Sequence, residues 1–204
     1  MGIDTIIFDL GGVLIDWNPK YVYRDVFDGD EQKVEWFLND ICTSEWNVAH
    51  DAGRPLDEGT ELLVAQYPEY EEWIRMYYDR WPDMLGGPIS ETVDLLYKLK
   101  QQNTHNLYAL TNWSGETFPV ALQRFEFLKC FEGIVVSGTE KTRKPFQKIY
   151  DITLERYNIT PEKAVFIDDN LDNVNAAINC GIKGIHFKNA NQLTRELKVL
   201  NVSI

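Results

Sequence analysis

The chain has 204 residues and a formal net charge of −12 at pH 7, with 25% charged and 44% hydrophobic residues. This length allows one domain with a full core, or one domain that carries an insertion. An acidic surface without a basic block repels phosphate backbones and anionic lipids, so we expect neither a nucleic acid nor a membrane as a partner.

The cysteines and the hydropathy pattern indicate the compartment. Cys42, Cys130 and Cys180 are widely separated and match neither a disulfide framework nor a CxxC metal motif, which fits a reducing environment. No positively charged segment precedes the first apolar residues, and no apolar run approaches the roughly 20 residues of a membrane span. We therefore expect a cytoplasmic protein. Nothing in the sequence indicates its oligomeric state.

The first predicted element is a buried strand over Thr5–Phe8, an apolar run rich in β-branched residues that ends at Asp9. Gly11 and Gly12 follow, and they let the backbone turn tightly and let a ligand approach the main chain. Ligands of open parallel sheets bind beyond the carboxyl ends of the strands, so Asp9 is a candidate functional residue. For this stretch alone, a core strand followed by a turn that Asp9 merely caps is an equally good interpretation.

Residues 17–84 have a different character, because strand-like runs give way to short amphipathic helices. Asn18-Pro19 is typical of a helix start. Of the 26 aromatic residues, 13 fall within residues 17–81, enough for a small core, and their helical spacing favours packing over a ligand cage. We therefore predict an α-helical cap domain over residues 17–84, inserted into a core domain formed by residues 1–16 and 85–204.

From residue 86 onward, strand and helix patterns alternate. Strands are expected at 107–110, 133–136, 164–167 and 184–187, and helices at 90–101, 115–124, 145–157 and 171–179. This alternation predicts the α/β class, with a Rossmann-like parallel sheet covered by helices on both faces.

Three of these strands end in polar residues: Asp9, the pair Thr111-Asn112, and the pair Asp168-Asp169. The carboxyl ends of parallel strands meet at one edge of the sheet, so these groups should converge. Three neighbouring carboxylates repel one another unless a cation lies between them, and an all-oxygen set suits Mg²⁺. The alternative for Asp168-Asp169 is a helix cap, which explains one of the two acids but not both.

Lys144 is the candidate for local positive charge in this acidic chain. Pro145 restricts Lys144 to an extended conformation and is expected to begin a helix. A surface lysine within a basic cluster is the alternative. Thr111 and Asn112 could donate hydrogen bonds to phosphate oxygens, or could instead cap the following helix.

Taken in order, these residues resemble the four motifs of the haloacid dehalogenase-like hydrolase superfamily. The motifs are an Asp after the first strand, Thr-Asn after a later strand, Lys-Pro, and Asp-Asp after a further strand. Segments 8–13 and 166–170 are similar to the branch of sugar 1-phosphate phosphatases. The resemblance implies a Rossmann-like core with strand order 5-4-1-2-3, a helical cap inserted after the first motif, and a site between them.

The resemblance also implies roles for the acids. Asp9 would attack phosphorus and form an aspartyl-phosphate; a carboxylate with a pKa of about 4 is ionised at neutral pH and needs no base to activate it. Mg²⁺ would be held by Asp9, the backbone carbonyl of Gly11 and Asp169, with Asp168 beside them. The implied protein is a Mg²⁺-dependent phosphatase of a small phosphorylated metabolite.

For the transferred group, the resemblance implies that Thr111 and Lys144 hold the phosphoryl oxygens, assisted by Asn112. One departure from the family pattern concerns Gly11, since most phosphatases of the superfamily have an Asp there that protonates the leaving group. General acid–base catalysis contributes roughly 10²–10⁴-fold. We therefore expect an acidic leaving oxygen, as in a sugar 1-phosphate or an acyl phosphate, or a replacement acid from the cap or from water.

Asp16 and His50 are candidate replacements, although a turn acid and a structural histidine are the simpler interpretations. Trp17, Trp46 and Arg54 are candidates for lining the substrate pocket, with Arg54 suited to a second anionic or hydroxylated group.

Two other functions remain open. A 2-haloacid dehalogenase-like hydrolase would use Asp9 without a metal, but Asp168 and Asp169 would then repel an anionic substrate. A non-catalytic phosphate-binding protein with this fold is compatible with Gly11. A phosphomutase is disfavoured because it depends on the acid that is missing there.

Overall fold

A five-stranded parallel sheet forms the centre of the larger part of the molecule. The computed structural model describes residues 2–204. The strands of the sheet are β1 (Thr5–Phe8), β4 (Asn106–Thr111), β5 (Gly133–Val136), β6 (Ala164–Asp168) and β7 (Lys183–His186). All four residues of β1 and all five of β6 are buried, as expected for a parallel sheet with both faces covered.

The strands lie side by side in the order β5-β4-β1-β6-β7. Counted in chain order as strands 1 to 5 of this sheet, they read 5-4-1-2-3 from β7 to β5, as predicted. The chain passes from β1 to β4 and β5 in one direction, and β6 and β7 lie on the other side of β1. The switch of direction therefore falls at β1, where open α/β sheets bind their ligands.

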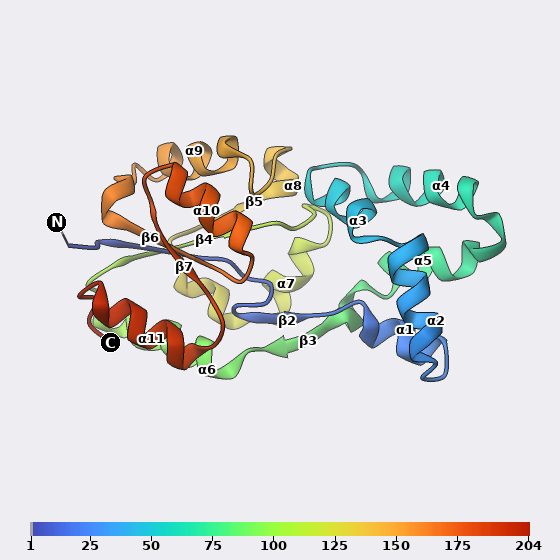
Figure 1. Cartoon of the computed structure of the whole chain (residues 1–204), viewed down its shortest axis with the longest axis horizontal. Coiled ribbons are helices and arrows are strands. Elements are labelled where there is room, and N and C mark those ends of the chain that lie inside the picture. Colours follow the sequence, from blue (N-terminus) through green and yellow to red (C-terminus); the bar gives the residue numbers. More distant parts are fainter. Residues whose placement is uncertain (1) are drawn as a thin grey trace.

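Two helical layers cover the sheet (Figure 1). On one side lie α6 (Ser90–Gln102) and α11 (Ala190–Val199), and on the other lie α9 (Gln147–Arg156) and α10 (Leu171–Asn179). Successive side chains of a strand point to opposite faces. Accordingly, Ile6 and Phe8 belong to the hydrophobic cluster that includes α6 and α11, and Ile7 to the cluster that includes α9 and α10. Near the carboxyl edge lie α7 (Phe118–Arg124) and α8 (Ser137–Glu140).

A group of helices occupies the other end of the molecule (Figure 1). These are α1 (Lys20–Val26), α2 (Glu31–Trp36), α3 (Ser44–Asp51), α4 (Leu56–Gln66) and α5 (Glu71–Asp79). Shorter turns of 3₁₀ or π type lie at Phe37–Ile41, Pro68–Tyr70, Trp81–Met84, Glu126–Cys130 and Pro161–Lys163.

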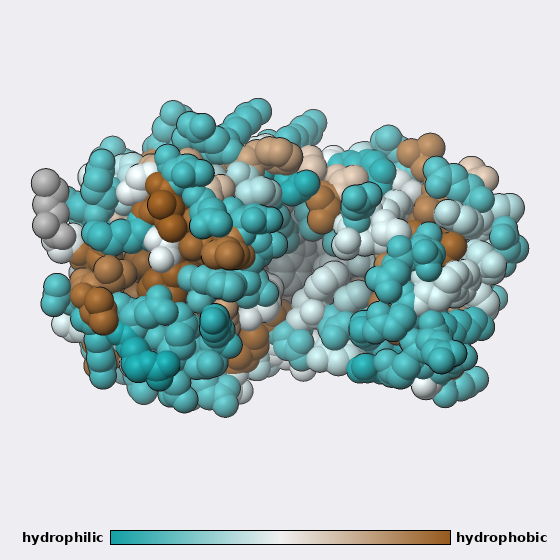
Figure 2. All heavy atoms as spheres, in the orientation of Figure 1, coloured by the Kyte–Doolittle hydropathy of each residue, from teal (hydrophilic) through white to brown (hydrophobic). Residues whose placement is uncertain are grey.

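The aromatic residues of this helical group pack against one another. The rings of Tyr23 and Phe37 lie 4.7 Å apart, and Trp73 meets Phe27 edge-on at 5.0 Å. Residues 17–84 contain the helices that we assign to the cap, and the division at residues 16 and 85 stays a prediction. This face of the molecule is mostly hydrophilic and is hollowed between the two parts (Figure 2).

A two-stranded antiparallel sheet joins the two parts, and it was not predicted. It pairs β2 (Ile15–Trp17) with β3 (Leu85–Pro88). The sequence Leu-Gly-Gly-Pro of β3 has little strand propensity, because glycine and proline are depleted in strands. The paired residues lie 68–73 positions apart in the chain, so this contact and not local propensity decides the element. The two passages of the chain between the parts therefore lie side by side.

Two of the predicted helices start later in the structure. The helix expected from Pro145 begins at Gln147, so Pro145 does not open it and lies in the preceding loop. The helix expected over 115–124 begins at Phe118. Within residues 2–204, no helix has the length and apolar character that crossing a membrane requires.

Candidate active site

Asp9 lies at the carboxyl end of β1, at the switch point of the sheet. Its backbone N–H donates to the carbonyl of Ile167 on β6 (2.8 Å), and the N–H of Leu10 donates to its Oδ1 (2.7 Å). Gly12 turns the following loop with φ of +70°, and a Cβ there would overlap the carboxylate of Asp169. Glycine is therefore required for the loop after β1 to lie against the acid that follows β6.

Lys144 is fully buried between two of the predicted acids. Its Nζ lies 2.8 Å from Oδ1 of Asp9 and 2.7 Å from Oδ2 of Asp168. It also donates to the carbonyl of Leu110 at the end of β4 (3.0 Å). All the hydrogens of the ammonium group thus have acceptors, which buried charges require.

Asn112 holds the main chain of Lys144 in place. Its Nδ2 donates to the Lys144 carbonyl (3.0 Å), and its Oδ1 accepts from the Lys144 N–H (2.8 Å). The side-chain amide of Asn112 is thereby used in positioning Lys144. Thr111, the last residue of β4, is 1% exposed beside this pair.

Asp168 and Asp169 have different surroundings. Asp168 is completely buried and accepts from Lys144, from the N–H of Asn170 and from the side chain of Asn173. Asp169 is exposed. One carboxylate oxygen from each of Asp9, Asp168 and Asp169 lies within 4.8 Å of the other two. Within residues 2–204, this is the one such group of possible metal ligands.

This donor set fits a hard divalent cation such as Mg²⁺, because every available ligand atom is an oxygen. The oxygens of Asp168 already accept several hydrogen bonds, so Asp9 and Asp169 are the better placed ligands. The division in which Asp169 binds the ion and Asp168 lies beside it stays a prediction.

The electrostatics of the cluster also favour a cation. Burial raises the pKa of Asp9 to about 8 against the attraction of Lys144, and the charge of Asp168 adds to the rise. Burial and the charge of Asp168 likewise raise the pKa of Asp169. Burial lowers the pKa of Lys144, but Asp168 and Asp9 outweigh it and hold the ammonium charged. A divalent ion would favour the ionised form of Asp9.

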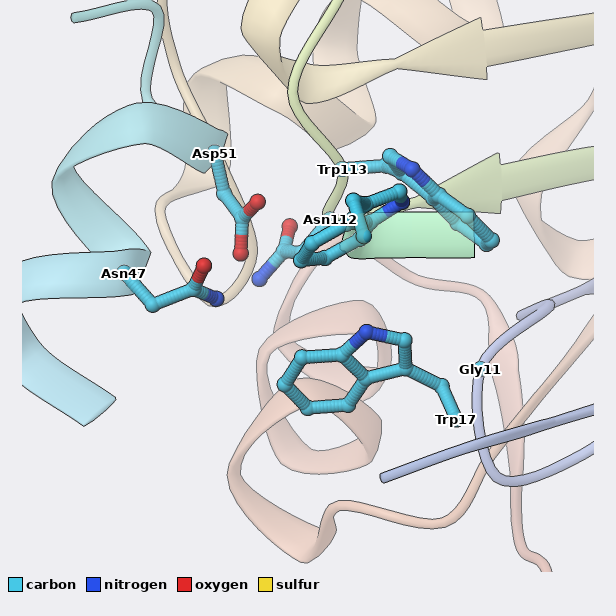
Figure 3. Close-up of a pocket in the computed structure, with 7 residues that line it drawn as sticks. Gly11, Trp17, Asn47, Asp51, Asn112 and Trp113 are labelled. Atoms are coloured by element: carbon cyan, nitrogen blue, oxygen red, sulfur yellow. The ribbon is translucent and has the colours of Figure 1, made fainter. Parts of the chain in front are cut away.

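A cavity of about 70 Å³ lies between the loops that follow β1 and β4 and the helix α3 (Figure 3). It is lined by Gly11, Trp17, Asn47, Asp51, Trp81, Asn112 and Trp113. The indole N–H groups of Trp17 and Trp81 are buried and have no hydrogen-bond partner in the described chain. Buried polar groups are normally paired, so these two donors are available to a ligand in the cavity.

A larger cavity of about 440 Å³ adjoins the first and extends among the cap helices. The two share four lining residues: Trp17, Asn47, Asp51 and Asn112. The larger one adds the polar side chains of Asn18, Lys20, Asn39 and Ser44. The combined space leads from the loops that carry Gly11 and Asn112 into the helical group.

Trp17 lines this space as predicted, but Trp46 and Arg54 line neither cavity. Trp46 donates through Nε1 to the carbonyl of Gly59 (2.9 Å), and Arg54 donates to the carbonyl of Trp46 (2.8 Å). Trp46 therefore connects α3 to α4, and Arg54 ties the loop between these helices back to α3.

Asp16 and His50 also lie outside both cavities. Asp16, in β2, accepts from the hydroxyl of Tyr21 (2.6 Å). His50 is buried, with Nδ1 2.7 Å from the Tyr78 hydroxyl and Nε2 3.3 Å from the guanidinium of Arg54. Neither is placed to replace the acid that is absent at Gly11.

The buried state of His50 leads to a prediction for stability. Burial lowers its pKa from 6.5 to about 4, and the charge of Arg54 acts in the same direction. Between pH 6.5 and 4 the unfolded chain binds a proton that the folded chain does not, so stability falls as the pH falls. The His50→Gln variant should lose less Tm over this range than the wild type. Equal losses would show that the folded protein protonates His50 without penalty.

Four residues at the cavity were missed by sequence reasoning: Asn47, Asp51, Trp81 and Trp113. Asn47 and Asp51 are four positions apart on α3, so they share one face of the helix. A polar pair on one face of an aromatic-rich segment is a signal that could have been noticed. The two tryptophans were indistinguishable from packing residues.

The motif order, the sheet order and the paired lysine agree with one family. A family model described as haloacid dehalogenase-like hydrolase matches residues 3–181. The chain belongs to the haloacid dehalogenase-like hydrolases. The resemblance drawn from the four motifs is confirmed at this level.

Similar proteins extend over almost the whole hydrolase chain. The sesquiterpene phosphatase astK of Aspergillus oryzae is 29% identical over 195 residues, covering 95% of this chain and 94% of its own. A phosphorylated carbohydrates phosphatase of Thermotoga maritima is 28% identical over 191 residues, covering 90% and 84%. The magnesium complex of a HAD family enzyme from Bacteroides thetaiotaomicron superposes with a TM-score of 0.70 at 22% identity, covering 93% and 95%.

Proposed function

We propose that this hydrolase is a Mg²⁺-dependent phosphatase that acts on a small phosphorylated metabolite through an aspartyl-phosphate on Asp9. The observation that carries the proposal is the buried Lys144, paired with both Asp9 and Asp168, with Asp169 in the same cluster. A carboxylate beside a fixed cation can accept a phosphoryl group whose negative charge must be offset. The phosphatases among the similar proteins support this reaction class.

In the proposed reaction, an oxygen of Asp9 attacks phosphorus and the bond from phosphorus to the leaving oxygen breaks. Water then attacks the aspartyl-phosphate and releases inorganic phosphate. The ion, bound by Asp9, the Gly11 carbonyl and Asp169 with Asp168 beside them, would supply charge that offsets repulsion between the nucleophile and the phosphate dianion. The magnesium complex of the structural neighbour supports the choice of Mg²⁺.

The remaining site residues are proposed to hold the transferred group. Lys144 neutralises the phosphoryl oxygens from the side of Asp168, and Thr111 donates to them from the end of β4. Asn112 acts by fixing the main chain of Lys144 on both sides. The fixed charge of Lys144 needs no rearrangement when charge develops on the phosphoryl group.

For the substrate, we propose a phosphorylated carbohydrate, with sugar 1-phosphates as the first candidates. The larger cavity presents amides and hydroxyls, among them Asn39, Ser44 and Asn47, which can bond to several sugar hydroxyls. Trp17 and Trp81 offer aromatic faces together with two unpaired N–H donors. The phosphorylated carbohydrates phosphatase among the similar proteins supports this class.

The test is a screen of phosphorylated metabolites, weighted toward sugar phosphates, with purified protein. Phosphate release should require Mg²⁺, cease with EDTA, and return when Mg²⁺ is added in excess. Release of halide from 2-haloacids without phosphate release would support the dehalogenase alternative. Phosphate binding without any turnover would support the non-catalytic alternative.

A further inference from the structure

The proposed reaction requires a proton donor, and the residues at the acidic cluster are already engaged. Asp9 is the nucleophile, and Lys144 and Asp168 are bonded to each other and to further partners. Asp169 faces the proposed ion. A side chain that protonates the leaving oxygen must therefore lie outside this cluster, at the cavity that adjoins it.

Asp51 is the one titratable side chain among the described residues that line the smaller cavity, of about 70 Å³. Figure 3 shows its carboxylate pointing into the cavity toward Asn112, while Gly11 and Trp17 lie on other sides of the same space. Gly11, two positions after the proposed nucleophile Asp9, borders the same cavity as Asp51.

The position of Asp51 is set by contacts between α3 and the sheet. Its backbone carbonyl accepts from the hydroxyl of Ser137, the first residue of α8. Two residues further on, Gly53 approaches the backbone of Gly138 so closely that a Cβ would not fit. The backbone of Ser114, in the loop after Asn112, lies near enough to the Asp51 carboxylate to lower its pKa. The end of the cap helix is thus anchored to the loops that carry the phosphate-binding residues.

We propose that Asp51 is the catalytic acid and base of this site, supplied from α3 in place of the acid that is missing at Gly11. This inference rests on the proposed phosphatase function. The helical group would then contribute to the chemistry as well as to substrate selection, because the docked α3 supplies the proton donor.

The protonation behaviour of Asp51 suits this role. Burial raises its pKa to about 7, against the opposing effects of Arg143, the Ser114 backbone and Lys144. Tyr77 and Tyr78 of α5 are the other titratable groups whose charge is coupled to it. An acid with a pKa near the working pH can both give and take a proton.

The two half-reactions balance. As the bond from Asp9 to phosphorus forms, the bond to the leaving oxygen breaks, and protonated Asp51 gives its proton to that oxygen to release an alcohol. The Asp51 carboxylate then takes a proton from water as the water oxygen attacks phosphorus. The bond to Asp9 breaks, inorganic phosphate leaves, and Asp51 is protonated again.

The test compares kcat/KM of wild type and Asp51→Asn in the full chain with Mg²⁺, using p-nitrophenyl phosphate and phenyl phosphate. The variant should lose roughly 10²–10⁴-fold on phenyl phosphate, whose leaving group needs protonation, but less than about 10-fold on the nitrophenyl ester. Since the base is also removed, nitrophenolate should appear as a burst of about one per enzyme followed by slow turnover.

Two variants serve as controls. Asp57→Asn makes the same change at an exposed acid in the first turn of α4 and should match the wild type. Asp51→Glu keeps a proton donor and should restore part of the phenyl phosphate activity.

Three outcomes would overturn the proposal. Equal losses of Asp51→Asn on both esters without a burst would indicate a structural role only. Full activity of Asp51→Asn would exclude any role. If the wild type releases no phosphate from either ester or from any compound of the metabolite screen, the proposed function fails and this inference fails with it.

Discussion

Replacing Asp9 with asparagine is expected to reduce phosphate release by roughly 10⁴–10⁶-fold, the scale at which loss of a covalent nucleophile reduces turnover. The amide is almost the same size as the carboxylate but is a poor nucleophile. The variant should remain folded, because Lys144 keeps Asp168 as a partner 2.7 Å away. Phosphate release under saturating Mg²⁺ and a thermal melt measure the two effects.

Asp4→Asn is the matched control for this change. Asp4 precedes the same strand at its opposite end, where its carboxylate accepts from the Thr5 hydroxyl. The control should retain wild-type turnover. Substantial phosphate release by Asp9→Asn in the same preparation would exclude Asp9 as the phosphate acceptor.

Replacing Lys144 with methionine is expected to remove activity and to destabilise the protein by about 3–5 kcal/mol, since removing one partner of a buried ion pair leaves its charge uncompensated. Here the loss leaves the nearly buried Asp9 and the completely buried Asp168 without the cation that lies between them. Part of the loss should be recovered when Mg²⁺ is added, because the ion supplies charge at the same cluster. Denaturant titration with and without Mg²⁺ measures the change.

Lys148→Met provides the comparison for Lys144→Met. Lys148 lies four residues further on and is exposed, so the same substitution there should change stability by less than about 0.5 kcal/mol. If the two variants unfold at the same denaturant concentration, the ion pair at Lys144 does not stabilise the fold as we infer.

Much of the α/β core was predictable because its strands are short apolar runs with defined ends. The run Gly133–Val136 and the helix Leu171–Asn179 occur with the predicted bounds. The two-stranded sheet was not predictable, since Leu85–Pro88 becomes a strand only through pairing with Ile15–Trp17. Pro145 fits the first turn of a helix, but the structure places it two residues before α9.

At the site, strand order alone brings Asp9 and Asp168 together, because both end neighbouring parallel strands. The side-chain partners were less predictable. Asn112 could be expected to contact phosphate, whereas its amide holds the Lys144 backbone. Asp51 could not be identified, because its relation to the core depends on how α3 docks on α8. Docking between elements distant in sequence has no local signal.

The most direct test of the covalent mechanism is mass spectrometry of a quenched reaction. Wild-type protein, Mg²⁺ and an accepted phosphate ester are mixed, acid-quenched during turnover and digested. We expect the peptide that contains Asp9 to carry one added phosphoryl group, and the Asp9→Asn peptide to carry none. Phosphate release with an unmodified Asp9 peptide, or a phosphoryl group on another residue, would contradict the mechanism.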